Sequence, residues 1–249
     1  MKVPLDGGET IPLLPAPQWG SKAWGMALDA TSVYWANQSP AAIMKVSIAG
    51  GPPVTVTSLT YVPMAIAVDA TAAYWSGSGL VAKVALDGGT PVTLASGQAG
   101  STNLALDATN IYWTGGPDGQ SVMTVPTAGG TPATLVSGYA WPGNIAVDHT
   151  SVYWDYGLVP TIMKMPLGGG TPVTLITGQY PTAIAVDAAF LYWIDVRDTV
   201  MKLPLAGGDP ITLASGQNSP TAIALDADCV YWSNGGSGVD DGSVMKLAK

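Results

Sequence analysis

The sequence predicts an all-β protein, a six-bladed β-propeller with four antiparallel strands in each blade. Two observations predict this class: a ten-residue text related to IAVDATSVYW recurs six times, and its period is close to 40 residues. The Tyr-Trp pairs of the repeats begin at Tyr34, Tyr74, Tyr112, Tyr153, Tyr192 and Tyr231, in steps of 40, 38, 41, 39 and 39. A period of this size indicates stacked units that cannot bury their faces alone.

The fifth repeat shows why each unit is expected to hold four strands, named A to D. These strands are expected at residues 182–187 (TAIAVD), 191–195 (LYWID), 199–205 (TVMKLPL) and 210–216 (PITLASG). Strand A is almost wholly apolar, which is typical of a strand buried on both faces. Strand D alternates, so Ile211 and Leu213 are expected to point inward, and Pro210 stands first, where a strand tolerates proline. No stretch holds a helical period for ten residues.

The repeats divide the chain into a single domain of six blades. Their ranges are 22–58, 62–97, 101–137, 142–178, 181–216, and 220–249 plus 9–15. The last repeat ends after strand C. The first copy of the strand D sequence, GGETIPLLP at 7–15, comes before the first strand A. The N-terminal strand at residues 9–14 is therefore expected to complete the last blade in a 3+1 closure that removes its open edge. Residues 244–248 are expected to outcompete 1–5 for strand C because they follow strand B directly, which leaves residues 1–4 frayed.

Composition excludes several classes of function. The formal net charge is −8, and nine basic residues spread over the repeats cannot form the patch that a nucleic acid requires. One cysteine rules out an internal disulfide or a cysteine metal cage, and one histidine rules out a histidine-rich metal site within one chain. No apolar run reaches the roughly 18–20 residues of a membrane span. We expect no cofactor and a monomer.

The run PTAIAVDAAFLYWIDVRDTVMKLPLAGGDPITL resembles the YWTD repeats of lipoprotein-receptor propellers and, more loosely, NHL-type propellers. The shared features are the Ala-Val-Asp strand end, the Tyr-Trp pair, the basic residue of strand C and the glycine-rich hairpin. At the motif's fourth position this chain has Asn37, Gly77, Gly115, Tyr156, Asp195 and Asn234, so only one blade keeps the acid. The resemblance implies protein partners and an extracellular or cell-surface location. The N-terminus has no signal-peptide core and begins inside a repeat, so an excised or engineered array is also expected.

The repeated residues are interpreted first as parts of the fold. The aspartate that ends each strand A is expected to accept backbone N–H groups of its own turn, and a ring of carboxylates that binds a cation is the alternative. The strand C lysines are expected to be solvated. His149, in an A–B turn, is expected to be exposed, and Cys229 to be a small buried apolar residue.

Subtracting the repeated residues leaves a candidate binding surface. The spare aromatic residues and nearby acids are Trp19, Trp24, Tyr61, Tyr139, Trp141, Tyr156, Tyr180, Asp155, Asp195 and Asp198. They fall in or beside D–A connections and in B–C connections, which are expected to emerge on the same face of a blade. Exposed aromatic residues in polar loops indicate a binding surface, and the alternative is that they plug the mouth of the fold.

Three functions follow from this pattern. The first is a non-catalytic recognition propeller that binds an extracellular protein or glycan through the D–A and B–C loop face. The second is a metal-dependent propeller hydrolase or lyase, in which loop carboxylates with Asn103 or Asn144 hold calcium. The third is an engineered or excised repeat scaffold without a ligand. The sequence favours the first and predicts that the chain is not an enzyme.

Overall fold

The computed structural model describes residues 13, 21–100, 103–139, 141–157, 159–236 and 242–249. The chain divides into two compact units, Met1–Thr134 and Leu135–Lys249, and each is described here by itself. The described residues form antiparallel strands joined by turns, without a helix. That the two units make up a single domain stays a prediction.

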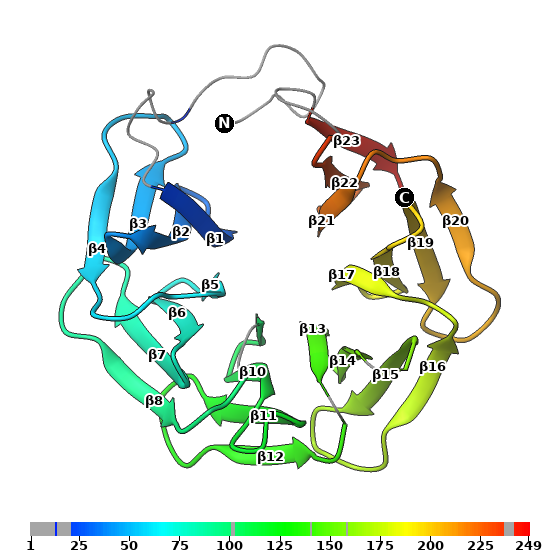
Figure 1. The fold of residues 1–249 in the computed structure, drawn as a ribbon, viewed down its shortest axis with the longest axis horizontal. Helices are drawn as coiled ribbons and strands as arrows, with labels where there is room; N and C mark the ends of the chain where they lie inside the picture. Colours follow the sequence, from blue (N-terminus) through cyan, green and yellow to red (C-terminus); the bar gives the residue numbers. More distant parts are fainter. Residues whose placement is uncertain (1–12, 14–20, 101–102, 140, 158, 237–241) are drawn as a thin grey trace. The chain divides into compact units, whose positions relative to one another are not determined.

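Unit 1 holds three four-stranded antiparallel sheets, and in each the strands follow chain order (Figure 1). The strands are β1 (Ser21–Leu28), β2 (Ser32–Ser39), β3 (Ala41–Ser47), β4 (Val54–Ser58), β5 (Ile66–Val68), β6 (Ala72–Gly77), β7 (Leu80–Ala85), β8 (Val92–Ser96), β9 (Leu104–Leu106), β10 (Asn110–Gly115), β11 (Ser121–Pro126) and β12 (Ala133–Val136). The unit boundary falls within β12. Each sheet holds one repeat, with strands A to D in the predicted order.

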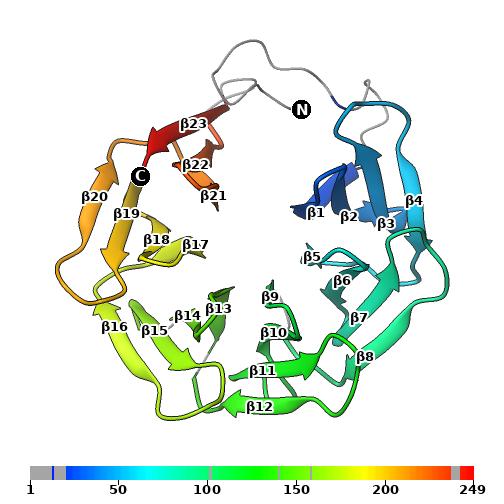
Figure 2. The same cartoon turned by 180° about the vertical axis from the view of Figure 1, so that it is seen from behind.

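Unit 2 holds two four-stranded sheets and one sheet with three described strands. The strands are β13 (Pro142–Val147), β14 (Ser151–Tyr156), β15 (Thr161–Pro166), β16 (Val173–Thr177), β17 (Pro181–Val186), β18 (Phe190–Asp195), β19 (Thr199–Pro204), β20 (Ile211–Ala214), β21 (Pro220–Leu225), β22 (Cys229–Asn234) and β23 (Ser243–Ala248). The A strands β13, β17 and β21 lie side by side in both views (Figure 2). Neighbouring sheets of the unit therefore meet along their A strands.

The predicted closure of the last blade is described only in part. As predicted, β23 takes the strand C position, pairing with β22 from Cys229↔Ala248 to Asn234↔Ser243. Residues 1–4, and the proposed strand at residues 9–14 apart from Leu13, lie outside the described residues. Leu13 is buried against Val46. In unit 1 the strand D residue Leu94 belongs in the same way to a cluster with Val125, the counterpart of Val46, so the packing of Leu13 matches that of a strand D residue.

The strand at the centre of each core is B, not A. The sequence predicts an A strand buried on both faces, but β17 is only half-buried, whereas β6 is buried at every residue. Strand B is paired on both edges and covered by neighbouring sheets, while strand A has a sheet partner on one edge only. The outer strand also differs from the prediction, because Ile211 is 44% exposed while Leu213 is half-buried.

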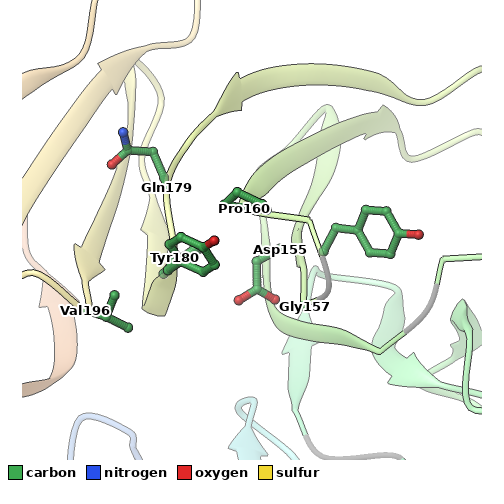
Figure 3. A pocket seen from close by; sticks show the side chains of 8 residues that line it. Asp155, Gly157, Pro160, Gln179, Tyr180 and Val196 are labelled. Atoms are coloured by element: carbon green, nitrogen blue, oxygen red, sulfur yellow. The ribbon is translucent and has the colours of Figure 1, made fainter.

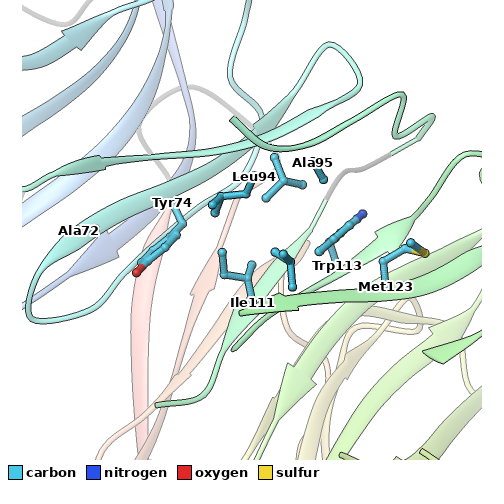
Figure 4. Packing of buried hydrophobic residues seen from close by; sticks show 9 residues of the cluster. Ala72, Tyr74, Leu94, Ala95, Ile111, Trp113 and Met123 are labelled. Carbon is cyan, nitrogen blue, oxygen red and sulfur yellow. The ribbon is translucent and has the colours of Figure 1, made fainter. Parts of the chain in front are cut away.

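Aromatic residues of strand B join neighbouring sheets, as the cluster between the second and third sheets of unit 1 shows (Figure 4). Tyr74 from β6 and Leu94 from β8 pack against Ile111 and Trp113 from β10. The tryptophans of β6, β10, β14 and β18 are all fully buried. Rings of this size supply much of the apolar area that stabilises each interface between sheets.

The predicted role of the strand-end aspartates is confirmed in all six repeats, and a second contact is added. In the fifth repeat, Asp187 Oδ1 accepts the N–H groups of Ala189 and Phe190 at 2.9 and 2.8 Å. Its Oδ2 accepts the hydroxyl hydrogen of Tyr192 at 3.0 Å. The same pair of contacts occurs at Asp29, Asp69, Asp107, Asp148 and Asp226. The Asp-x₄-Tyr spacing of the repeat thus ties each A–B turn to strand B.

The prediction that the strand C lysines are solvated agrees with the exposed Lys246 but is wrong for Lys45, Lys83 and Lys202. Lys45 donates to the carbonyl oxygen of Leu86 at 2.6 Å, and Lys83 to that of Thr127 at 2.5 Å. Both bonds join neighbouring sheets of unit 1. In unit 2, Lys202 lies over the ring of Phe190, with Nζ 4.5 Å from the centroid. The alkyl stems cover apolar surface while the ammonium groups find acceptors, so these lysines help to hold the sheets.

Asp187 makes the stability of unit 2 sensitive to acid. Burial raises the pKa of Asp187, but the bonds from Lys249 and from the turn outweigh burial and lower the pKa to about 2. Its contribution is therefore present above the unfolded pKa near 4 and is lost as pH falls toward 2. We expect Asp187→Asn to lower the free energy of unfolding by about 1 kcal/mol at pH 7, allowing for solvent screening, and by almost nothing at pH 2. Urea unfolding at both pH values checks this, and an equal loss at both would contradict it.

Candidate functional site

Two departures from the repeat, Asp155 itself and Gly143, meet at one carboxyl group, that of Asp155 in β14. The other repeats place Ala36, Ser76, Thr114, Ile194 and Ser233 at the position of Asp155. The counterparts of Gly143 in the other five repeats are all larger residues: Trp24, Met64, Thr102, Thr182 and Thr221. A Cβ atom at position 143 would lie 2.4 Å from Asp155 Oδ1. Asn144 stands where three repeats have alanine and the third also has asparagine, and its Nδ2 donates to Asp155 Oδ2 at 2.9 Å. The fold does not require an acid here, and the neighbouring glycine makes room for one.

Burial makes the carboxyl group of Asp155 unusual. The residue is 6% exposed, and desolvation raises its pKa to about 6, against the lowering effect of hydrogen bonds from Asn144 and backbone N–H groups. Its Oδ1 is enclosed, with almost no surface open to solvent. A buried carboxylate is costly to the fold, and such groups cluster at functional sites.

Asp155 lines a pocket in unit 2 with a volume of about 180 Å³ (Figure 3). The other lining residues are Tyr156, Gly157, Pro160, Gln179, Tyr180, Pro181 and Val196. The walls are mostly apolar, and the ring of Tyr180 and the carboxyl group of Asp155 both face the cavity. Ligand pockets for drug-sized molecules occupy roughly 300–1,000 Å³, so this one suits a single side chain or a similarly small group.

Two kinds of loop build the pocket, and both lie at one edge of the unit. The D–A connection before β17 and the B–C loop after β14 are joined by the bond from Gln179 N–H to the Pro160 carbonyl oxygen at 3.2 Å. Unit 1 repeats this bond between Gln98 and Gly79 at 2.9 Å. The prediction that D–A and B–C connections emerge together is thus confirmed within each unit. We call this edge of unit 2 the loop end.

Exposed aromatic side chains stand at the loop end. Trp141 is 73% exposed and Tyr180 is 46% exposed, and they hold equivalent places before two neighbouring A strands. Trp141 has a φ of +61°, a left-handed conformation that is rare for a bulky residue. Its carbonyl oxygen accepts the N–H of Gly157 at 3.1 Å, which links the Trp141 turn to the pocket wall.

The structure separates the other predicted site residues into different environments. Trp19 lies outside the described residues, and Trp24 is 43% exposed on β1 of unit 1. The hydroxyl oxygen of Tyr61 accepts the indole N–H of Trp75 at 3.2 Å. Tyr139 contacts Trp154 and Tyr156 edge-on, with ring centroids 5.7 and 5.4 Å away. Tyr156, Tyr180 and Asp155 are the predicted residues that the pocket brings together.

The two other acids have different surroundings from that of Asp155. Asp195 is 1% exposed and accepts the N–H of Tyr180 at 2.8 Å through Oδ2. Its Oδ1 lies 3.8 Å from Nε of Arg197. Asp198 is exposed in the B–C loop with a φ of +61°. Of the remaining predictions, Cys229 is buried and His149 is exposed, both as expected.

Sequence reasoning missed the pocket residues Gln179, Pro160, Pro181 and Val196. A signal was present for Gln179, because Ser/Thr-Gly-Gln recurs at residues 96–98, 177–179 and 215–217. In each case the glutamine Oε1 accepts the indole N–H of its sheet's tryptophan. Val196 carried no such signal, since a valine in a B–C loop has no pattern that sets it apart.

Comparison with solved structures decides the fold class. A streptogramin B lyase structure superposes with a TM-score of 0.75 at 14% identity, over 95% of this chain and 85% of that one. The fold is a six-bladed β-propeller. A nidogen/laminin complex structure, a YWTD propeller, matches with a TM-score of 0.65 at 23% identity, over 76% of this chain and 79% of that one. The resemblance to YWTD-type propellers is therefore confirmed for the fold. The sequence matches no protein-family model and no curated protein.

The same comparisons overturn the prediction that the chain is not an enzyme. The streptogramin B lyase is one enzyme with this fold. The PQQ-bound aldose sugar dehydrogenase from Streptomyces coelicolor is another, with a TM-score of 0.63 at 15% identity over 91% of this chain and 93% of that one. The propeller repeat that led to the prediction is shared with catalytic proteins, so the repeat does not decide between binding and catalysis.

Among the residues that the structure describes, no three or more His, Cys, Asp or Glu side chains gather as metal ligands would. Within the same residues, no helix has the length and apolar character needed to cross a membrane.

Proposed function

We propose that the loop end of unit 2 recognises a segment of a partner protein. The observation that carries this proposal is Trp141, a large aromatic side chain that is 73% exposed on a left-handed backbone. Such a conformation costs on the order of 1–3 kcal/mol. Exposure of the indole ring to water adds a second unfavourable contribution. A partner that covers the ring would recover the second of these costs.

Three further apolar side chains are exposed in the loops of the loop end. Val159, Tyr180 and Val196 come from the same loops and are 44%, 46% and 58% exposed. Exposed apolar clusters of this kind mark interaction sites. Tryptophan and tyrosine are also the residues that most often dominate the energy of protein interfaces. The patch thus has the composition of an interface centre, with Arg197 and Asp198 as polar residues beside it.

Charge and fold also indicate what kind of partner the loop end would bind. The chain has a formal net charge of −8 and a sequence pI near 4.2, which favours partners with basic segments. One structure with this fold is a nidogen/laminin complex, in which two proteins are bound to each other. We extend this likeness to an extracellular or cell-surface location and to a monomeric chain.

Selection from a displayed library of random twelve-residue peptides tests the proposal. We expect Trp141→Gly and Tyr180→Ala each to weaken binding of the selected peptides at least tenfold, measured by calorimetry. Glycine is chosen at position 141 because φ of +61° favours it, so the ring is removed without added strain. The matched control is Val173→Ala, which removes an apolar side chain that is 52% exposed on β16.

Two outcomes would overturn the proposal. One is a set of selected peptides that bind both loop-end variants as tightly as they bind the parent protein. The other is a glycan array in which a sugar binds the parent but not Trp141→Gly, while no peptide is selected. The second outcome would assign the loop end to carbohydrate recognition.

A further inference from the structure

The turn before β13 meets β14 at a bulge that is wider than its counterparts in unit 2. In β17 and β21, an alanine of strand A pairs with the strand B residue that corresponds to Asp155. In β13 the register passes from Pro142↔Tyr156 directly to Ile145↔Trp154. Two residues of β13 therefore stand opposite the single residue Asp155, and neither pairs with it.

The side chain of Asp155 fills this wide bulge. Its carboxyl group accepts hydrogen bonds from the backbone N–H groups of Gly143 and Asn144, and Asn144 Nδ2 donates to Oδ2 at 2.9 Å. Because a Cβ atom on Gly143 would lie 2.4 Å from Oδ1, a larger residue there would displace the carboxyl group. One side chain thus holds two positions that backbone pairing holds in the neighbouring sheets.

The same end of β14 also holds Trp141. Its carbonyl oxygen accepts the N–H of Gly157 at 3.1 Å, and a Cβ atom on Gly157 would lie 2.6 Å from that oxygen. The Trp141 side chain is 73% exposed, so its own packing contributes little to the position of the ring. The turn is therefore positioned from two sides, by Gly157 at Trp141 and by Asp155 at the residues that follow Pro142.

This arrangement opposes folding, and the chain contains a neutral alternative. Asp155 is 6% exposed, and burial of a carboxyl group is unfavourable even where the group is hydrogen-bonded. In the last repeat, Thr221 and Ser233 take the places of Gly143 and Asp155, and their hydroxyl groups bond to each other at 3.0 Å. Residues that lower stability are expected where binding or activity requires them.

We propose that Asp155 is a positioning residue of the loop end, whose carboxyl group keeps the bulge of β13 wide and so places Trp141 for contact with the partner protein. This inference rests on the proposed function. Oδ1 is enclosed and Oδ2 is held by Asn144. The effect of Asp155 on a partner is therefore carried along the backbone, from Gly143 through Pro142 to Trp141.

Exchange of one arrangement for the other tests the inference in the full chain. The double variant Gly143→Thr/Asp155→Ser introduces the pair of residues that the last repeat holds, so it is expected to fold. We expect it to bind peptides selected on the parent protein about tenfold more weakly in calorimetry, because the turn is no longer preorganised. Its midpoint of urea unfolding at pH 7.5 should be equal or higher. A purely structural role would not produce weaker binding without lower stability.

A second variant and a control accompany the exchange. Asp155→Asn keeps the shape of the side chain but replaces one acceptor oxygen with a donor amide, and it should also weaken peptide binding without lowering the midpoint. Asp209→Asn removes the same charge from an exposed turn of unit 2. This control should bind the peptides as the parent protein does, which separates the local contact from the effect of net charge.

Fluorine NMR follows the ring itself. The protein is labelled with 5-fluorotryptophan, and the Trp141 signal is identified by its absence in Trp141→Gly. We expect this signal to shift in the double variant and to keep its position in Asp209→Asn. The signal of Trp193, which is fully buried on β18, should stay in place in both.

The outcomes separate this inference from the proposed function. Parent-like peptide binding in both Asp155 variants, or a Trp141 signal that does not move in the double variant, overturns the positioning role. Weaker binding that comes with a lower midpoint in both variants also overturns it. In these cases, peptide binding that is lost in Trp141→Gly leaves the proposed function standing. Peptides that bind Trp141→Gly as tightly as the parent protein overturn the proposed function and the positioning role together.

Discussion

Replacing Trp193 with alanine is expected to lower the free energy of unfolding by about 3–5 kcal/mol. The indole ring is fully buried on β18, in a cluster with Tyr153, Ile162 and Leu203 that joins two sheets of unit 2. The change removes the ring's packing and leaves a cavity that a rigid β-sheet interface closes only in part. Urea unfolding followed by circular dichroism measures the loss, and a loss below about 1 kcal/mol would show that strand B does not carry the core.

Phenylalanine substitutions separate packing from hydrogen bonding at the same position of two sheets. Trp193 Nε1 donates to Gln179 Oε1 at 3.3 Å, whereas Trp154 Nε1 is buried with no partner among the described residues. Tyr139 stands where the other sheets of unit 2 have glutamine. We expect Trp193→Phe to cost about 1 kcal/mol more than Trp154→Phe, since only the first breaks a hydrogen bond. Equal costs would mean that the Gln179 bond contributes nothing.

The repeat made the fold predictable because each of its recurring residues has a direct physical role. The spacing from Asp187 to Tyr192 holds a turn against the next strand, and every repeat uses the same two contacts. Strand order follows from the short turns, which leave no route except an antiparallel meander. Burial was harder to predict, because an apolar run such as TAIAVD gives no sign that only one of its edges is paired. The contacts of Lys45 and Lys83 were missed because each acceptor is a backbone carbonyl of the next sheet, which has no sequence signature.

The candidate site was predictable only where the chain departs from its own repeat. Subtraction found Asp155, Tyr156 and Tyr180, which line one pocket. It could not rank them above Tyr61, whose hydroxyl group instead bonds to a core tryptophan. The sequence holds a finer signal, because Gly143 departs from the repeat together with Asp155. That these two positions touch is a matter of strand register and of a bulge between Pro142 and Ile145, which the sequence alone does not reveal.

The second large effect is expected at Asp155, where a substitution should stabilise the protein. Burial raises the pKa of Asp155 to about 6, from a usual value near 4 in the unfolded chain. Between these two values the folded state holds more protons than the unfolded state, so stability falls as pH rises from 4 to 6. The cost of about 2 kcal/mol is complete above pH 7 and absent near pH 4. We therefore expect Asp155→Asn to raise the free energy of unfolding by about 1–2 kcal/mol at pH 7.5 and by almost nothing at pH 4.

The sign of this pH dependence distinguishes Asp155 from the turn aspartates. Asp187→Asn should destabilise at neutral pH, because the pKa of Asp187 is lowered to about 2, whereas Asp155→Asn should stabilise. Urea unfolding of both variants at pH 4 and pH 7.5 compares the two directly. A loss of stability in Asp155→Asn at pH 7.5 would mean that the carboxylate is well solvated or paired in the folded protein. A gain would show that unit 2 keeps a destabilising buried charge at the pocket.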